Sequence, residues 1–468
     1  MTGSYVDSRG ASSKLVEFFI LTLTLASTCC LWFLGLLTLP VAIWLTSLFL
    51  IALVFLCWYR FDGGLHPVFL FMGLLLVFQG GRLLGYITGA VDDPFQIELQ
   101  TWVPFNVHPD TKFISLFVVA FSALVIYLSC RLFYRKNVSE NNEKHHQYLR
   151  VLYLFFLFTF PFLVIKDVLY LRYMMAHGGY YAIYTDYEGV VSSAGVIVRT
   201  LGAFATSAFL LIYLIETNPR RLTIVTSLYL LGSVGDLLMG YRGKVYTLVL
   251  MLWYLRNLKR GKPFPLRTML IAGFVMTTVG VVIVAFREQH AVQYLNPMAF
   301  LAQQGISFNV TECAIEYRHA FERYGASYLL HDLTAAFVPV MEAKDGQFIA
   351  RDLSLFLNPF SFEQGAGTGS DYLAQLYVAG AIRGVFLGSL FVGFLFVWLQ
   401  RIGKELWGQI VMVCIGQSLI YIPRGGLLEP FSQGVKVGLP ILALLWIADF
   451  WTRHDSHKQL SAQHVLKA

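Results

Sequence analysis

The sequence has 468 residues, of which 57% are hydrophobic and only 13% are charged. Soluble domains carry about 25% charged residues, so this composition excludes an ordinary soluble globular protein. The formal net charge of +7 could suggest a nucleic-acid partner, but the basic residues are scattered over many short loops and form no basic face. We therefore expect a protein of the lipid bilayer with no nucleic-acid partner.

Long apolar runs follow one another along the chain. A helix needs about 20 apolar residues to cross the hydrocarbon core of a bilayer. On this basis we predict an all-α, polytopic transmembrane helical bundle of about 12 spans, with a tight turn at Gly240–Lys244 between the seventh and the eighth. The predicted spans are 15–37, 41–59, 67–88, 113–133, 151–173, 196–216, 222–240, 245–256, 268–286, 384–400, 405–422 and 434–451.

The distribution of Lys and Arg predicts the orientation of these spans. Compact basic loops at 131–150 and 256–267 belong in the cytoplasm by the positive-inside rule, which places both termini there. The chain then divides into nine spans with short loops (1–286), one large periplasmic loop (287–383), three further spans (384–451) and a cytoplasmic tail (452–468). A loop as long as 287–383 is usually functional in a compact protein.

Several cations lie at the predicted outer ends of spans, against this orientation bias. Cations cost about 3 kcal/mol at the centre of a membrane and less at its edge, so a convergent set favours an anionic ligand. Arginine suits phosphate because its planar guanidinium binds two oxygens at once. For any single cation, the alternative is that it reaches out to lipid phosphates. The set consists of Arg199, Arg242, Lys244, Arg287, Arg424 and Lys436.

Other ionisable residues are weaker candidates. Arg82, Lys166 and Asp167 lie within predicted spans, where they could form a structural ion pair or part of the same site. Asp236 precedes Arg242 by about one and a half turns of a predicted helix and could orient it.

The long loop offers candidates for a general base. Histidine suits proton transfer because its pKa is about 6.5, although a loop histidine is more often simply solvated. We select His331 as the candidate base. The alternatives are His319, Asp332, Glu363 and Asp371, and Asp371 is also a candidate for substrate binding.

The sequence lacks a Walker loop, a His-Glu-x-x-His motif and a Cys-x-x-Cys motif, so we expect no cofactor and no metal site. Asp92 and Asp93 follow the third predicted span next to Pro94, where an ordinary turn is expected. If phosphate is bound, arginine rather than a metal should balance its charge.

Three short motifs resemble those of the Wzy O-antigen polymerases. They are Gly-Tyr-Arg-Gly at 240–243 after a mid-chain span, Arg-Gly-Gly at 424–426 at the outer end of a late span, and the Gly- and Ser-rich segment 367–384 that leads out of the long loop. His-Gly-Gly-Tyr at 177–180 resembles a further family feature.

This resemblance implies a bacterial inner-membrane glycosyltransferase that polymerises repeat units carried on undecaprenyl diphosphate at the periplasmic face. Preorganised cations would stabilise the diphosphate leaving group. The implied catalytic residues are Arg242, Arg287, Arg424 and His331, and the implied substrate-binding residues are Arg199, Lys244, Asp371 and Lys436. Implied partners are the lipid-linked oligosaccharide, a flippase and a chain-length regulator.

Three other classes of protein stay open. An O-antigen ligase shares the architecture and the donor but transfers the glycan to a lipid A–core acceptor. A flippase or secondary transporter usually has internal repeats, short loops and ionisable groups near the midplane, and no repeat is evident here. A structural or assembly partner would need no convergent arginines.

Overall fold

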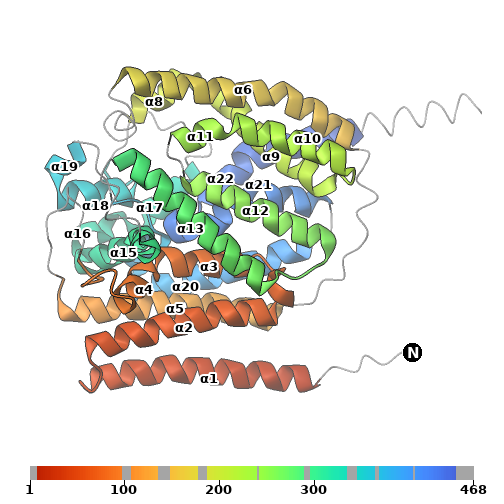
Figure 1. Ribbon diagram of the computed structural model, residues 1–468. Helices are drawn as coiled ribbons and strands as arrows, with labels where there is room; N and C mark the ends of the chain where they lie inside the picture. Colours follow the sequence, from red (N-terminus) through yellow and green to blue (C-terminus); the bar gives the residue numbers. More distant parts are fainter. Residues whose placement is uncertain are drawn as a thin grey trace, which may run out of the picture.

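A computed structural model describes residues 8–96, 107–134, 148–177, 187–239, 242–288, 296–334, 345–363, 368–403 and 406–449. These residues contain helices and no strand, as the sequence predicts. The long helices run roughly parallel to one another, and α1, α2 and α5 form one side of the bundle while α6 and α10 form the other (Figure 1).

Seven helices among the described residues are long and apolar enough to cross a membrane. A further pair, α3 (Val68–Phe78) and α4 (Gly81–Ile87), also qualifies as one span but is bent by 56°. A count of twelve spans and the orientation of the termini stay predictions. The seven are part of α1 (Ser8–Phe33), α2 (Leu39–Arg60), α5 (Pro109–Phe133), α6 (Leu149–Ala176), α9 (Gly195–Ile215), α20 (Tyr372–Ile402) and the stretch Glu429–Asp449.

The remaining bundle helices are not among these seven. They are α10 (Pro219–Gly232), α11 (Val234–Leu238), α12 (Arg242–Arg260), α13 (Leu266–Glu288) and α21 (Leu406–Tyr421). Two details of the sequence prediction are wrong here. Asp236 and Arg242 are on separate helices, α11 and α12, and Arg242 and Lys244 belong to the first turn of α12 rather than to a tight turn.

The predicted long loop is largely helical. Its short helices gather at one end of the bundle, which we call the loop end (Figure 1). Asn296 caps the first of them, because its side chain accepts a hydrogen bond from the backbone N–H of Met298, 2.9 Å away. These helices are α14 (Pro297–Gln304), α15 (Ile306–Glu316), α16 (Arg318–Phe321), α17 (Gly325–Thr334), α18 (Ile349–Leu357) and α19 (Pro359–Glu363).

Helix α20 joins the loop end to the bundle and is broken near its start. Ala381 has φ 49° and ψ −139°, a conformation that costs a non-glycine residue energy and persists only where its surroundings enforce it. The break separates a short first segment, Tyr372–Ala379, from the long part that packs along α5. The predicted span 384–400 corresponds to this long part.

Candidate functional site

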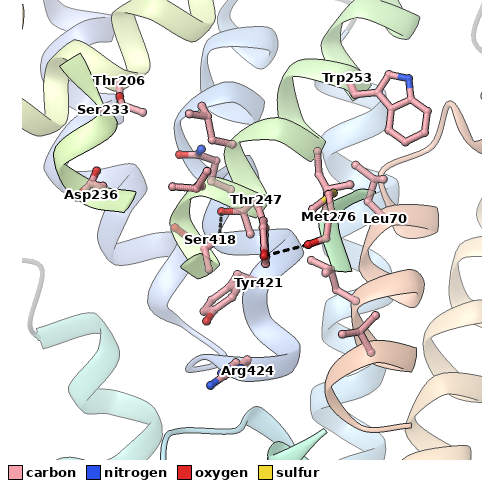
Figure 2. Close-up of a pocket in the computed structure, with 18 of the residues that line it drawn as sticks. Leu70, Thr206, Ser233, Asp236, Thr247, Trp253, Met276, Ser418, Tyr421 and Arg424 are labelled. Carbon is pink, nitrogen blue, oxygen red and sulfur yellow. Dashed lines mark hydrogen bonds between the residues drawn. The ribbon is translucent and has the colours of Figure 1, made fainter. Parts of the chain in front are cut away.

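A cavity of about 900 Å³ lies among the bundle helices. Residues of α3, α6, α9, α11, α12, α13, α14 and α21 line it, together with the segment that follows α21. Figure 2 shows Arg424 at one end of a group of lining residues and Trp253 towards the other. The cavity therefore runs between a charged region and an apolar one.

Arg424 provides charge at the end nearest the loop helices. It closes the short 3-10 turn Ile422–Arg424 that ends α21. Its Nη1 donates a hydrogen bond to Oε1 of Gln304 on α14, 3.0 Å away, and its guanidinium lies 5.3 Å from the ring centroid of Phe78 on α3. It makes no ion pair with any carboxylate of the described residues.

Gly243 of the Gly-Tyr-Arg-Gly motif lies against the end of α21, three residues before Arg424. A Cβ added at Gly243 would lie 2.6 Å from the hydroxyl of Tyr421, closer than real contacts allow. Glycine therefore lets the first turn of α12 approach the end of α21. Both Gly243 and Tyr421 line the cavity, so the backbone places Arg242 and Lys244 at its edge. The side chains of Arg242, Lys244 and Arg287 lie outside what the structure describes.

A second cation, Arg199, lines the cavity from the first turns of α9. Its Nε donates to the backbone oxygen of Gly195, 3.3 Å away, within the same helix. Lys436 lies near enough to interact with the charges of Arg199 and Glu429, but it is exposed and does not line the cavity. The structure thus brings Arg199 and Arg424 to one cavity and leaves Lys436 beside it.

A third cation, Lys166 on α6, also lines the cavity and is paired with carboxylates. Its Nζ lies 2.8 Å from Oδ1 of Asp167 and 3.6 Å from Oδ1 of Asp236. The sequence left two roles open for Lys166, a structural ion pair or a part of the site. The geometry is compatible with both, because Lys166 is ion-paired and also lines the cavity. Asp236 lines the cavity beside it (Figure 2).

The opposite part of the cavity is apolar. Phe69 and Leu70 of α3, Trp253 of α12, and Met269 and Met276 of α13 line it. The lining thus combines three cations and the carboxylates of Asp236 and Glu429 with a set of apolar side chains, a combination suited to an amphiphile with a charged head.

One family model, O-antigen polysaccharide polymerase Wzy, matches residues 16–455. The chain belongs to the Wzy family. Comparisons with curated proteins and with solved structures give no match. Members of this family are glycosyltransferase-like polymerases that act on lipid-linked oligosaccharide in a membrane, and the apolar helices agree with a multi-pass membrane protein.

His331, the candidate base of this Wzy-family chain, lies on α17 outside the cavity lining. Its ring packs edge-on against Phe348 with the centroids 4.5 Å apart, and its buried Nε2 has no hydrogen-bond partner among the described residues. Burial lowers the pKa of His331, which favours the neutral ring.

Asp332, the next residue, contacts the segment that follows Arg424. Its Oδ2 accepts hydrogen bonds from the backbone N–H of Leu428 (3.4 Å) and from Nε2 of Gln375 (3.5 Å). Burial raises the pKa of the Asp332 carboxyl to about 6 from its ordinary value near 3.8. The sequence offered Asp332 only as one of several possible bases.

Asp371, a predicted substrate-binding residue, has its partners within the protein. It is fully buried at the N-cap of α20 and accepts hydrogen bonds from the backbone N–H groups of Leu373 and Ala374. The side chains of Gln79 and Thr311 donate to it as well. With these four donors and no place in the cavity lining, Asp371 ties the long loop to the break between α3 and α4.

Arg82 likewise has backbone partners. Its Nε donates to the carbonyl oxygen of Pro94, 2.9 Å away, and its Nη2 contacts the carbonyl oxygens of Asp93 and Gln96. The Asp93 carboxylate accepts from the N–H of Phe95 at 2.9 Å, as in an ordinary turn. Arg82 thus shapes this turn instead of lining the cavity.

The sequence did not single out Gln304, Tyr421 or Phe78, which surround Arg424. Each is an ordinary residue at an ordinary helical position. Only the fold brings them together, so the sequence contained no local signal for them.

Proposed function

We propose that this chain transfers a growing glycan from undecaprenyl diphosphate to a new undecaprenyl-diphosphate-linked repeat unit at the periplasmic face of the bacterial inner membrane. The observation that supports this most directly is the cavity, in which Arg424, Arg199 and Lys166 line the same space as an apolar channel. A polyprenyl diphosphate has the same division into an anionic head and an apolar tail. In this proposal the loop end faces the periplasm and both termini face the cytoplasm.

The diphosphate leaves with a developing negative charge, and fixed cations in a site shielded from water stabilise such charge most effectively. Arg424 is suited to this role because its described partners, Gln304 and Phe78, are neutral. We infer that cations of the chain, rather than a bound metal, balance this charge. Arg242 and Arg287 are proposed as further catalytic cations, and Lys244 and Lys436 as further binding residues near the head group.

In the proposed reaction, a hydroxyl oxygen of the acceptor sugar attacks the anomeric carbon of the growing glycan. A new C–O bond forms, the bond from that carbon to the diphosphate oxygen breaks, and its electron pair leaves with the diphosphate. The hydroxyl proton passes to a base. His331 is the candidate, because its unpartnered Nε2 could accept a proton once the sugars are bound. A flippase that supplies repeat units and a regulator of chain length are proposed partners.

The test is complementation of a strain from which this gene has been deleted, followed by gel display of its lipopolysaccharide. Deletion should leave lipopolysaccharide core capped by a single repeat unit. The wild-type gene should restore the ladder of bands that O-antigen chains of different lengths produce. Arg424→Ala should restore only a faint ladder of short chains because a leaving-group contact is lost, and Arg199→Ala should shorten the chains less. Arg323→Ala is the matched control, because Arg323 is exposed at the loop end and lies over the ring of Tyr324.

Protein levels must be matched by immunoblot. Full ladders from both Arg424→Ala and Arg199→Ala would remove the proposed mechanism. Core without any repeat unit in the deletion strain would instead support a ligase or a flippase.

A further inference from the structure

The main chain that follows Arg424 is held by two side chains from other parts of the molecule. Oδ2 of Asp332 accepts from the N–H of Leu428 at 3.4 Å, and Oε1 of Gln375 accepts from the N–H of Leu427 at 2.9 Å. Gln375 also donates to Asp332 through its Nε2, at 3.5 Å. The two side chains therefore form one connected clamp on the segment 424–428.

The fit at this clamp is close. A Cβ added at Gly426 would lie 2.2 Å from Oδ2 of Asp332 and 2.8 Å from its Oδ1. The carboxylate therefore rests directly on the backbone of the Arg-Gly-Gly motif. Neither Asp332 nor Gln375 lines the cavity, so neither is placed to contact a ligand there.

We propose that Asp332 is a positioning residue that, together with Gln375, fixes the position of Arg424 in the cavity. Asp332 belongs to α17 at the loop end, and Gln375 belongs to the short segment of α20 before the break at Ala381. The clamp thus joins the long loop to the cation at the diphosphate end of the cavity. This proposal rests on the proposed function, since it gives Arg424 its role.

The same carboxylate could instead be the proton acceptor of the reaction, and one substitution separates the two roles. Asp332→Asn keeps an oxygen that can accept from both Leu428 and Gln375, because both donors meet the same atom, Oδ2. It removes the ability to take up a proton. A positioning role therefore survives this change and a general-base role does not.

The experiment uses the full-length protein in proteoliposomes with an undecaprenyl-diphosphate-linked repeat unit as substrate. Polymerisation rates are compared for wild type, Asp332→Ala and Asp332→Asn, and for Asp332→Ala in an Arg424→Ala background. Because displacing a catalytic group by about 1 Å can cost a hundredfold, we expect Asp332→Ala to lower the rate about tenfold or more. Asp332→Asn should stay within about threefold of wild type, and Asp332→Ala should cause no further loss once Arg424 is absent.

Asp352→Ala is the matched control. Asp352 is a buried carboxylate at the same end of the bundle that accepts from the hydroxyl of Tyr328 on α17 (2.8 Å) and from the N–H of Gly346 (2.6 Å). A structural change of this kind should alter the rate by the same factor in both backgrounds.

Two outcomes would overturn the proposal. One is an Asp332→Asn protein as impaired as Asp332→Ala, which would indicate a base. The other is an equal effect of Asp332→Ala with and without Arg424, which would indicate general destabilisation. A fully active Arg424→Ala protein would contradict the proposed function itself, so the two failures are distinguishable.

Discussion

Arg60 and Arg131 at one end of the bundle have a different kind of partner from Arg424 at the other. At the end away from the loop helices, Arg60 of α2 lies 3.0 Å from the carboxylate of Glu17 on α1, and Arg131 of α5 lies 3.7 Å from it. The hydroxyl of Tyr127 donates to the same carboxylate. At the loop end, Arg424 faces the neutral amide of Gln304.

This difference separates two uses of the same side chain. A carboxylate already neutralises part of the charge of Arg60 and Arg131, and their geometry joins three helices. Arg424 makes no such ion pair among the described residues, although the carboxylates of Asp236 and Glu429 also line the cavity, so an anion that enters can supply the missing charge. For these three arginines, the partner distinguishes the two that are ion-paired from the one that is proposed to bind an anion.

The largest expected effect comes from breaking the structural cluster. Glu17→Ala leaves two cations near the membrane without their carboxylate, which should destabilise the protein by about 2 kcal/mol because one arginine is partly exposed. Thermal unfolding of the purified protein in detergent measures this as a lower midpoint. Arg424→Ala, measured in parallel, should leave the midpoint nearly unchanged. An equally lowered midpoint in both variants would contradict the distinction between the ion-paired arginines and Arg424.

A smaller effect is expected at the contact between Gly243 and Tyr421. Gly243→Ala places a methyl group against Tyr421, displaces α12 from α21, and should lower the polymerisation rate about tenfold through misplaced catalytic groups. Tyr421→Leu in the same protein removes the aromatic ring that causes the collision and should restore part of the rate. Additive losses in the double variant would show that the two positions act independently.

The last prediction concerns the pH dependence of stability and the clamp residue Asp332. Its pKa is raised from 3.8 to about 6 in the folded protein, so the folded state binds more protons than the unfolded state between these values. Stability should therefore decrease as pH rises from about 4 to 6 and level off above.

Asp332→Asn removes this contribution, so the difference in unfolding midpoint between wild type and variant, followed from pH 4 to 7, isolates it. His331 has a lowered pKa and contributes with the opposite sign in both proteins, which cancels in the difference. A difference that does not change with pH would contradict the raised pKa.

The sequence predicted the all-helical fold, because apolar run length is a local property, and it placed Arg199 and Arg424 at the ends of apolar runs that line one cavity. It could not predict the pairing of Gln375 with the 424–428 segment or of Gly243 with Tyr421, since these contacts join helices that are distant in the chain. At Asp371 the sequence indicated a carboxylate in the long loop, but it could not reveal the four groups that donate hydrogen bonds to this carboxylate. The break at Ala381 was hidden for a similar reason, because tertiary contacts rather than propensity enforce it.

Helix α14, which carries Gln304, is seated on α4 by main chain against main chain. A Cβ at Gly81 would lie 2.5 Å from the carbonyl oxygen of Leu301, and one at Gly305 would lie 2.3 Å from the nitrogen of Arg82. Contacts of this kind have no rotamers that could rearrange to make room. The part of the cavity wall that α14 forms is consequently a rigid part of the frame rather than a movable flap.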